Sequence, residues 1–172
     1  ESVRGLVLHE LTHLYAFAVS RAVMPSWYSE GFAELYGGQQ SFRWQDGELE
    51  VGGRMAAFRL EPLRERAGRF RIQELLDNDA LALFAVDRDK ALSFYAQSWT
   101  LVRFLREEAD KKTRARFAEW EELCHGAALG AEFGNPWAAN FKPANQLFRE
   151  TFGREMAELE EAYQAWVDGL FE

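Results

Sequence analysis

The chain of 172 residues is 48% hydrophobic and 15% aromatic, which favours one substantial core and gives little reason to expect a second. Its formal net charge of -8 argues against a nucleic-acid partner, because phosphate binding relies on a basic surface. No stretch approaches the roughly 20 uninterrupted apolar residues that span a bilayer. The single cysteine, Cys124, cannot form an internal disulfide and leaves the redox compartment open.

The first segment predicts a helix over residues 3–21, because it has no proline, one glycine and good helix formers. Nearly every position from 6 to 19 is apolar, and a helix that is apolar on all sides is typical of a protein interior. We therefore expect this helix to be buried. Its strongly polar groups are His9, Glu10 and His13.

A second helix is predicted over residues 27–36, after the start signals Pro25 and Ser26 and before two glycines. The next segment, 41–51, alternates apolar and polar residues around an Asp-Gly dipeptide that suits a two-residue hairpin turn. We expect a small β-hairpin whose aromatic residues pack against the helices. The pairs expected across its turn are Trp44 with Leu49 and Phe42 with Val51.

The rest of the chain shows helical periodicity, so the fold is predicted to be mainly α with one hairpin. The further helices are expected over residues 54–67, 72–76, 90–108, 112–123, 144–152 and 155–171. A long surface connection is expected between Gly126 and Pro143. The arginines at 59–71 are interleaved with glutamates, which predicts a solvated helix face.

The first helix contains the pattern HExxH, as His9-Glu10-Leu11-Thr12-His13. Two histidines four residues apart lie on one helix face, where their nitrogens can share a metal ion. Zinc suits imidazole, and a catalytic zinc takes three protein ligands and leaves a fourth position for water. The pattern therefore predicts a zinc site that needs one more ligand, with a pair of satisfied core histidines as the alternative.

The third ligand is expected on the second helix. A third histidine at the metzincin spacing is excluded, because those positions hold Ala16 and Val19. If the second helix folds back on the first, Glu30 comes level with the histidines. Gly31 beside it would let these two helices approach closely.

The HELTH sequence, followed by PSWYSEGFAE at residues 25–34, resembles the gluzincin metallopeptidases, in particular the peptidase-MA-like branch related to aminopeptidase N. This resemblance implies that His9, His13 and Glu30 bind zinc. It also implies that residues 1–172 form one zincin-like domain, the helical catalytic subdomain, and that this chain lacks the N-terminal β-sheet of the family. Export from a bacterial cytoplasm is a further expectation from the resemblance.

The implied activity is hydrolysis of peptide bonds in a peptide or protein substrate through a zinc-activated water, with Glu10 as the general base. The segment that begins at Tyr95 resembles the helix whose leading tyrosine stabilises the oxyanion, although Tyr95 also lies on an apolar stripe that would suit a core residue. Glu34 is expected to accept a hydrogen bond from a ligand histidine or, alternatively, to be a solvated glutamate.

A second functional hypothesis is a non-catalytic helical module. In such a pseudo-peptidase the metal, or the polar first helix alone, would stabilise the fold or support a protein partner. A structural zinc has a closed coordination shell, whereas a catalytic zinc keeps an open position, so the two hypotheses differ in the binding of chelating inhibitors.

Overall fold

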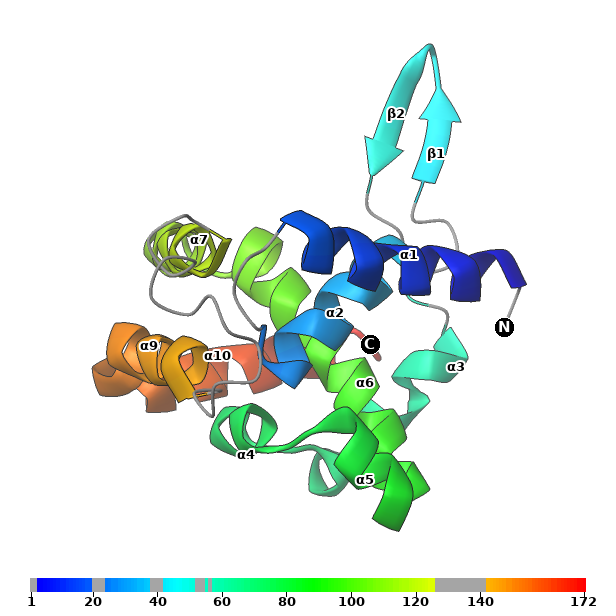
Figure 1. Cartoon of the computed structure of the whole chain (residues 1–172). Helices are drawn as coiled ribbons and strands as arrows, with labels where there is room; N and C mark the ends of the chain where they lie inside the picture. Colours follow the sequence, from blue (N-terminus) through cyan, green and yellow to red (C-terminus); the bar gives the residue numbers. More distant parts are fainter. Residues whose placement is uncertain (1–2, 20–23, 38–41, 52–54, 56, 126–141) are drawn as a thin grey trace.

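The computed structural model describes residues 3–19, 24–37, 42–51, 55, 57–125 and 142–172. The prediction of a mainly helical fold is confirmed (Figure 1). The α-helices are α1 (Val3–Val19), α2 (Ser26–Gly37), α3 (Ala57–Leu60), α4 (Ile72–Asp77), α5 (Ala80–Val86), α6 (Arg88–Arg103), α7 (Lys111–His125), α9 (Lys142–Phe152) and α10 (Met156–Gly169). No helix in the described ranges is long and apolar enough to cross a membrane.

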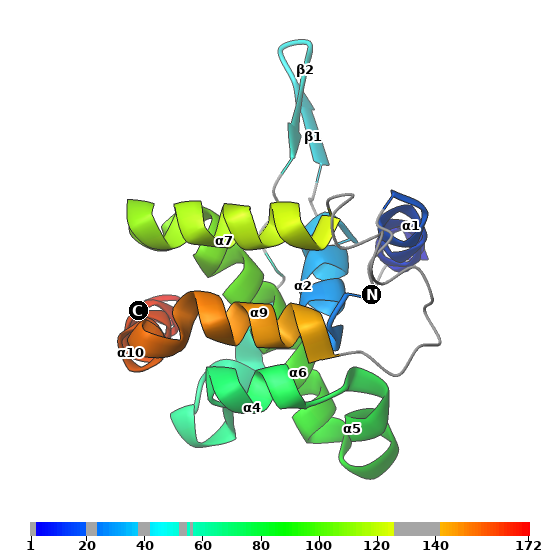
Figure 2. The ribbon, with the colours of Figure 1, turned by 60° about the vertical axis from the view of Figure 1, so that its left-hand side comes forward.

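A two-stranded hairpin joins α2 to the segment that contains α3. Strands β1 (Phe42–Gln45) and β2 (Glu48–Val51) pair antiparallel in the register expected from the turn sequence, with Trp44 opposite Leu49. Asp46 and Gly47 both have positive φ, 52° and 84°, as a type I′ turn requires. The hairpin ribbon extends away from the helices in two views (Figures 1 and 2). The side chains of Phe42 and Trp44 lie outside the described part of the structure, so the expected packing of these aromatic residues stays a prediction.

Helix α2 lies between α1 and α6, and glycines bring it close to both neighbours. A Cβ on Gly31 would lie 2.3 Å from the Ser98 carbonyl oxygen of α6. A Cβ on Gly37 would lie 2.6 Å from the Cα of His9 in α1. The expectation that Gly31 faces the first helix is therefore wrong, because Gly37, six residues further along α2, is the glycine at that contact.

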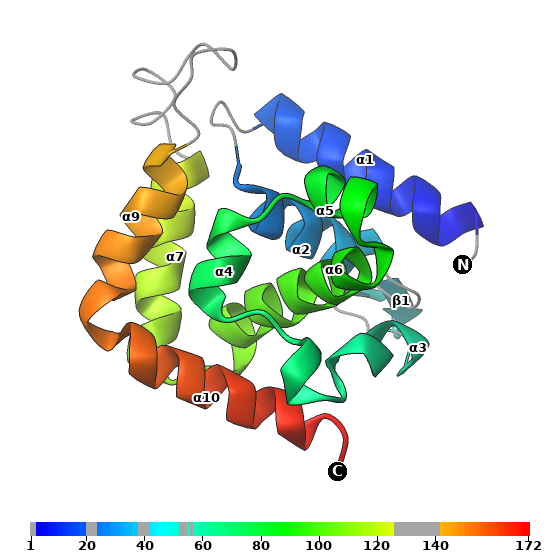
Figure 3. The same cartoon turned by 90° about the horizontal axis from the view of Figure 1, so that it is seen from below.

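An aromatic cluster holds the start of α2 from the other side. Trp27 stacks on Trp120 of α7, with ring centroids 5.6 Å apart, and meets Phe148 of α9 edge to face at 5.3 Å. The indole N–H of Trp27 donates to the side-chain oxygen of Asn145 at 3.0 Å. Trp27 and Trp120 are fully buried, so α2 is anchored in the core by large side chains. Seen from below, α2 and α6 occupy the middle of the molecule, with α1 along one edge and α10 along another (Figure 3).

Helix α1 is not buried, contrary to the expectation from its composition. It packs chiefly on α2 and lies at the periphery (Figure 2). Leu14 and Phe17, for example, are 63% and 77% exposed. The apolar composition means that burial of this helix would be favourable. Burial also requires other elements that cover its remaining faces, and composition does not predict these. The large apolar residues of α1 that are exposed are Val3, Leu6, Val7, Leu11, Leu14, Tyr15 and Phe17.

The prediction of one helix over residues 54–67 is wrong. Residues Ala57–Leu60 form one α-helical turn, and Glu61–Leu63 and Arg66–Gly68 form 3-10 turns. Pro62 explains the break, because proline has no N–H and its ring clashes with the preceding helical turn. The helix expected over 90–108 is α6, which starts after the cap Asp87 and ends in a π-helical turn, Phe104–Glu108.

The predicted solvated face of arginines is wrong for Arg69. Its side chain is buried, and its guanidinium donates to the Leu63 carbonyl at 2.6 Å and to Asp168 in α10 at 2.9 Å. Alternating charges along a sequence predict a solvated face only where the segment forms a regular helix. Because Pro62 breaks that helix, the arginines after it do not share one helix face, and Arg66 and Arg69 both pair with Asp168.

Replacing Gly31 with alanine is expected to destabilise the fold by about 1–3 kcal/mol, because the new methyl group would overlap the α6 backbone. The measurement is the free energy of unfolding from urea titrations of the metal-free protein. Gly169→Ala is the matched control, since a Cβ there meets nothing within 4 Å. Equal unfolding free energies for the two variants would contradict the close packing of α2 on α6.

Candidate metal centre

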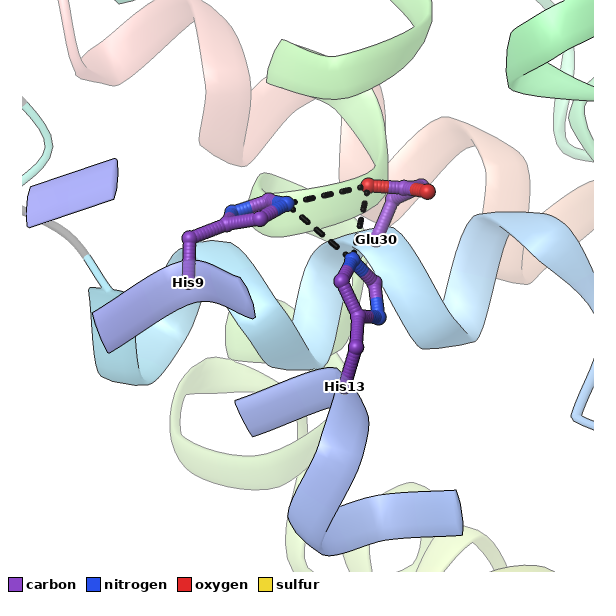
Figure 4. Close-up of side chains that lie close together, drawn as sticks. All are labelled: His9, His13 and Glu30. Atoms are coloured by element: carbon purple, nitrogen blue, oxygen red, sulfur yellow. Dashed lines mark hydrogen bonds and ion pairs between the residues drawn. The ribbon is translucent and has the colours of Figure 1, made fainter. Parts of the chain in front are cut away.

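Two helices bring three candidate metal ligands together. His9 and His13 project from one face of α1 toward α2, and Glu30 projects from α2 toward them (Figure 4). The Nε2 atoms of the two histidines are 3.1 Å apart. The Oε2 atom of Glu30 is 3.4 Å from each of these nitrogens. Among the described residues, this is the group of side chains whose ligand atoms could hold a metal ion.

The spacing of the three atoms fits a tetrahedral zinc site. Ligand atoms about 2.0–2.1 Å from a zinc ion, at tetrahedral angles, lie about 3.3 Å from one another. The observed separations of 3.1 and 3.4 Å are close to that value. Two imidazoles with one carboxylate are also a ligand set of catalytic zinc, in which the fourth position is open. The residues present therefore fit the metal that the sequence predicts.

The second nitrogen of each histidine ring has its own partner on α2. His9 Nδ1 is 3.3 Å from Oε1 of Glu34, and His13 Nδ1 is 3.1 Å from the hydroxyl oxygen of Ser29. When each Nδ1–H donates to that partner, the Nε2 lone pair is left facing the common point, which is the tautomer that a metal needs. Glu34 is the partner expected from the sequence. Ser29 was not expected, and its only sequence signal is its place beside Glu30.

Glu34 is buried and is itself held by Arg59. Burial alone would raise the pKa of the Glu34 carboxyl, but the hydrogen bond from His9 and the charge of Arg59 outweigh it, so that this pKa lies below its ordinary value. The sequence predicts Arg59 on a solvated face. Instead, the segment after the hairpin places the Arg59 guanidinium against a carboxylate that contacts a candidate ligand.

The charges of the centre are strongly coupled. Burial alone would lower the pKa of His9, but Glu30 and Glu34 raise it to about 9. Burial alone would raise the pKa of Glu30, but the two histidines lower it to about 2. In the metal-free protein at neutral pH, a proton on His9 therefore balances part of the charge of the two carboxylates. A cation that binds His9 must displace this proton.

The predicted catalytic residues line a cavity of about 470 Å³ beside the centre. His9, Glu10, Glu34 and Tyr95 all contribute to its wall. Glu10 is exposed, and Tyr95 is partly buried, with its ring against Phe94. Burial, together with the nearby carboxylates, raises the pKa of Tyr95 to about 12, so its hydroxyl keeps its proton at neutral pH and can donate a hydrogen bond. The structure thus brings both residues to the surface of one cavity.

Comparisons of the chain with models of protein families, with curated proteins and with solved structures find no match. The function is therefore inferred from the residues of the centre and their geometry. The resemblance to gluzincins, the identity of the metal and the roles of Glu10 and Tyr95 stay predictions.

Zinc affinity is expected to rise with pH. Because zinc must displace the proton from His9, the zinc Kd should fall about tenfold for each pH unit above pH 7 and level off near pH 9, where the free protein loses that proton. Glu34→Gln removes one carboxylate that raises the pKa of His9. This variant should reach its plateau at lower pH and bind zinc about 10–100-fold more weakly.

The measurement is competition titration with a zinc chelator at several pH values. Glu158→Gln, an exposed position on α10, is the control for the loss of one negative charge. A zinc Kd that does not change between pH 7 and pH 9 would contradict the assigned coupling of His9 to Glu30 and Glu34.

Proposed function

We propose that this chain is the helical catalytic subdomain of a zinc-dependent peptidase of the gluzincin type. The observation that carries the proposal is the meeting of His9, His13 and Glu30 at zinc-like spacings beside a cavity that Glu10 and Tyr95 also line. Satisfied core histidines would have no need to turn two Nε2 atoms toward each other and toward one carboxylate. The partners of the Nδ1 atoms add support. When Nδ1–H of each ring donates to Glu34 or Ser29, Nε2 of that ring is left free for a metal.

A zinc ion on these ligands would supply a bound water of lowered pKa and would polarise the carbonyl of the scissile bond. Glu10 would accept the proton of the attacking water and pass it to the leaving amine, because this residue lines the cavity that His9 also lines. Tyr95 would donate a hydrogen bond to the carbonyl oxygen as negative charge develops there. Glu34 and Ser29 would keep the histidine rings oriented.

The second candidate function is the non-catalytic helical module, and the exposed apolar face of α1 is the observation that favours it. Contiguous exposed apolar side chains are typical of surfaces that bind another protein. In that case the metal centre would only join α1 to α2. The cavity beside the centre favours the peptidase, because a structural zinc would need no access for a substrate.

The ligand set predicts about one zinc ion per chain in the wild-type protein after dialysis against metal-free buffer. Glu30→Ala should lose most of this zinc, because two imidazoles alone leave the site with a missing ligand. Elemental analysis gives the zinc content, and circular dichroism shows whether the variant keeps its helices. The same zinc content in both proteins would contradict the assigned ligand set.

Removing the predicted base should separate zinc binding from hydrolysis. Glu10→Gln is expected to keep its zinc and to lower the rate of peptide hydrolysis about 10²–10⁴-fold. Tyr95→Phe should also keep zinc and lower kcat about 10²–10³-fold. Tyr15→Phe, an exposed position on α1, is the control for loss of a tyrosine hydroxyl.

The assay follows cleavage of a mixed peptide pool by mass spectrometry, with the zinc content of each protein measured in parallel. Hydrolysis by Glu10→Gln at the wild-type rate would contradict the proposed role of Glu10. A zinc-loaded wild-type protein that cleaves no peptide would favour the helical module.

A further inference from the structure

The lining of the cavity beside the metal centre is partly polar and partly apolar. Its polar residues are His9, Glu10, Glu34, Tyr95 and Arg59, which pairs with Glu34. Its apolar residues come from three segments that are distant in the sequence. They are Leu6, Met55, Phe58, Pro62, Leu92 and Ala96.

Part of the apolar lining is exposed to solvent. Phe58 is 62% exposed and Leu92 is 46% exposed, although both line the cavity. Single exposed apolar residues are common on protein surfaces and do not by themselves indicate a binding site. Here, however, α1, the segment of α3 and α6 each contribute such residues to one cavity, and that cavity also contains the predicted general base. Covering these side chains would be favourable, in proportion to the apolar area removed from water.

The charges of the cavity select the kind of group that fits. Glu10 is acidic and exposed, and it disfavours a negatively charged ligand group. The Glu34 carboxylate adds little to this effect, because Arg59 and His9 pair with it. A lysine or arginine side chain would have to give up hydration against Met55 and Phe58. A large uncharged apolar side chain has neither cost.

We infer that this cavity binds one large apolar side chain of the peptide substrate, next to the bond that is cleaved, with Phe58 and Leu92 as specificity-determining residues. The inference rests on the proposed peptidase function and names the substrate class of that same site. The volume of the cavity, about 470 Å³, is within the usual range of ligand pockets, about 300–1,000 Å³. The substrate is therefore a peptide with a residue such as leucine or phenylalanine beside the scissile bond.

The test measures binding, so that it does not depend on turnover. The zinc-loaded protein is titrated by calorimetry with N-acetyl amino-acid hydroxamates of glycine, leucine, phenylalanine, aspartate and lysine. The hydroxamate group is common to all five probes and chelates zinc, so differences in affinity report the side chain. Leucine and phenylalanine hydroxamates should bind at least about tenfold more tightly than glycine hydroxamate. The aspartate and lysine probes should gain nothing over glycine.

Two variants test the apolar wall. Phe58→Ala and Leu92→Ala should each lose most of the preference for leucine over glycine hydroxamate, and the zinc content of each variant is measured in parallel. Phe84→Ala is the matched control, because Phe84 is 55% exposed on α5 and is not part of the cavity lining. This control should keep the wild-type preference.

Different results would contradict the specificity pocket and the proposed peptidase function. Equal binding of all five probes to the zinc-loaded protein would overturn the pocket and leave the open zinc site standing. A leucine preference that survives in both wall variants would also overturn the assignment of Phe58 and Leu92. Failure of every hydroxamate to bind the zinc-loaded protein would overturn the proposed function and the pocket together.

Discussion

The close packing of α2 between its two neighbours decides where every candidate ligand lies. Gly37 lets α1 approach at the backbone of His9, and Gly31 lets α6 approach at Ser98. The aromatic cluster around Trp27 fixes the start of the same helix. Since α2 carries Glu30 and the partners of both histidine rings, the position of one rigid helix sets the geometry of the whole centre. Precise placement by packed elements, and not by loops, is what a functional centre requires.

Electrostatics explains why this packing is tolerated. A buried carboxylate without a partner is costly, and α2 turns both Glu30 and Glu34 toward α1. The carboxylates are compensated by His9 and by Arg59, which arrives from the segment after the hairpin. In the metal-free protein a proton supplies the missing charge at His9. In the proposed metal centre a divalent cation would replace that proton, since the three ligand atoms already lie at spacings that suit it.

Local sequence patterns predict part of this arrangement, and long-range packing decides the rest. The HExxH spacing places two histidines on one helix face, and the turn at Asp46 and Gly47 sets the hairpin register, because both effects act within a few residues. The break at Pro62 and the helix α5 were missed, although both have a local signal: the proline itself, and Asp79, which caps the first turn of α5. The contacts of Arg59 and Ser29 and the exposure of α1 have no such signal, because they depend on which segments meet in space.

The exposure of α1 has a consequence for the centre itself. Most apolar side chains of this helix face solvent, so its attachment to α2 owes less to apolar burial than its composition indicates. The contact includes the tight approach at Gly37 and the polar groups of the centre. A cation shared by α1 and α2 would bind the docked arrangement and not the separated one, and it would therefore stabilise docking by mass action. Because α1 also supplies Glu10 and Leu6 to the cavity, the same cation would hold the base and one wall of the pocket in place. In the proposed peptidase, metal binding would thus stabilise the docked position of α1 that completes the substrate site.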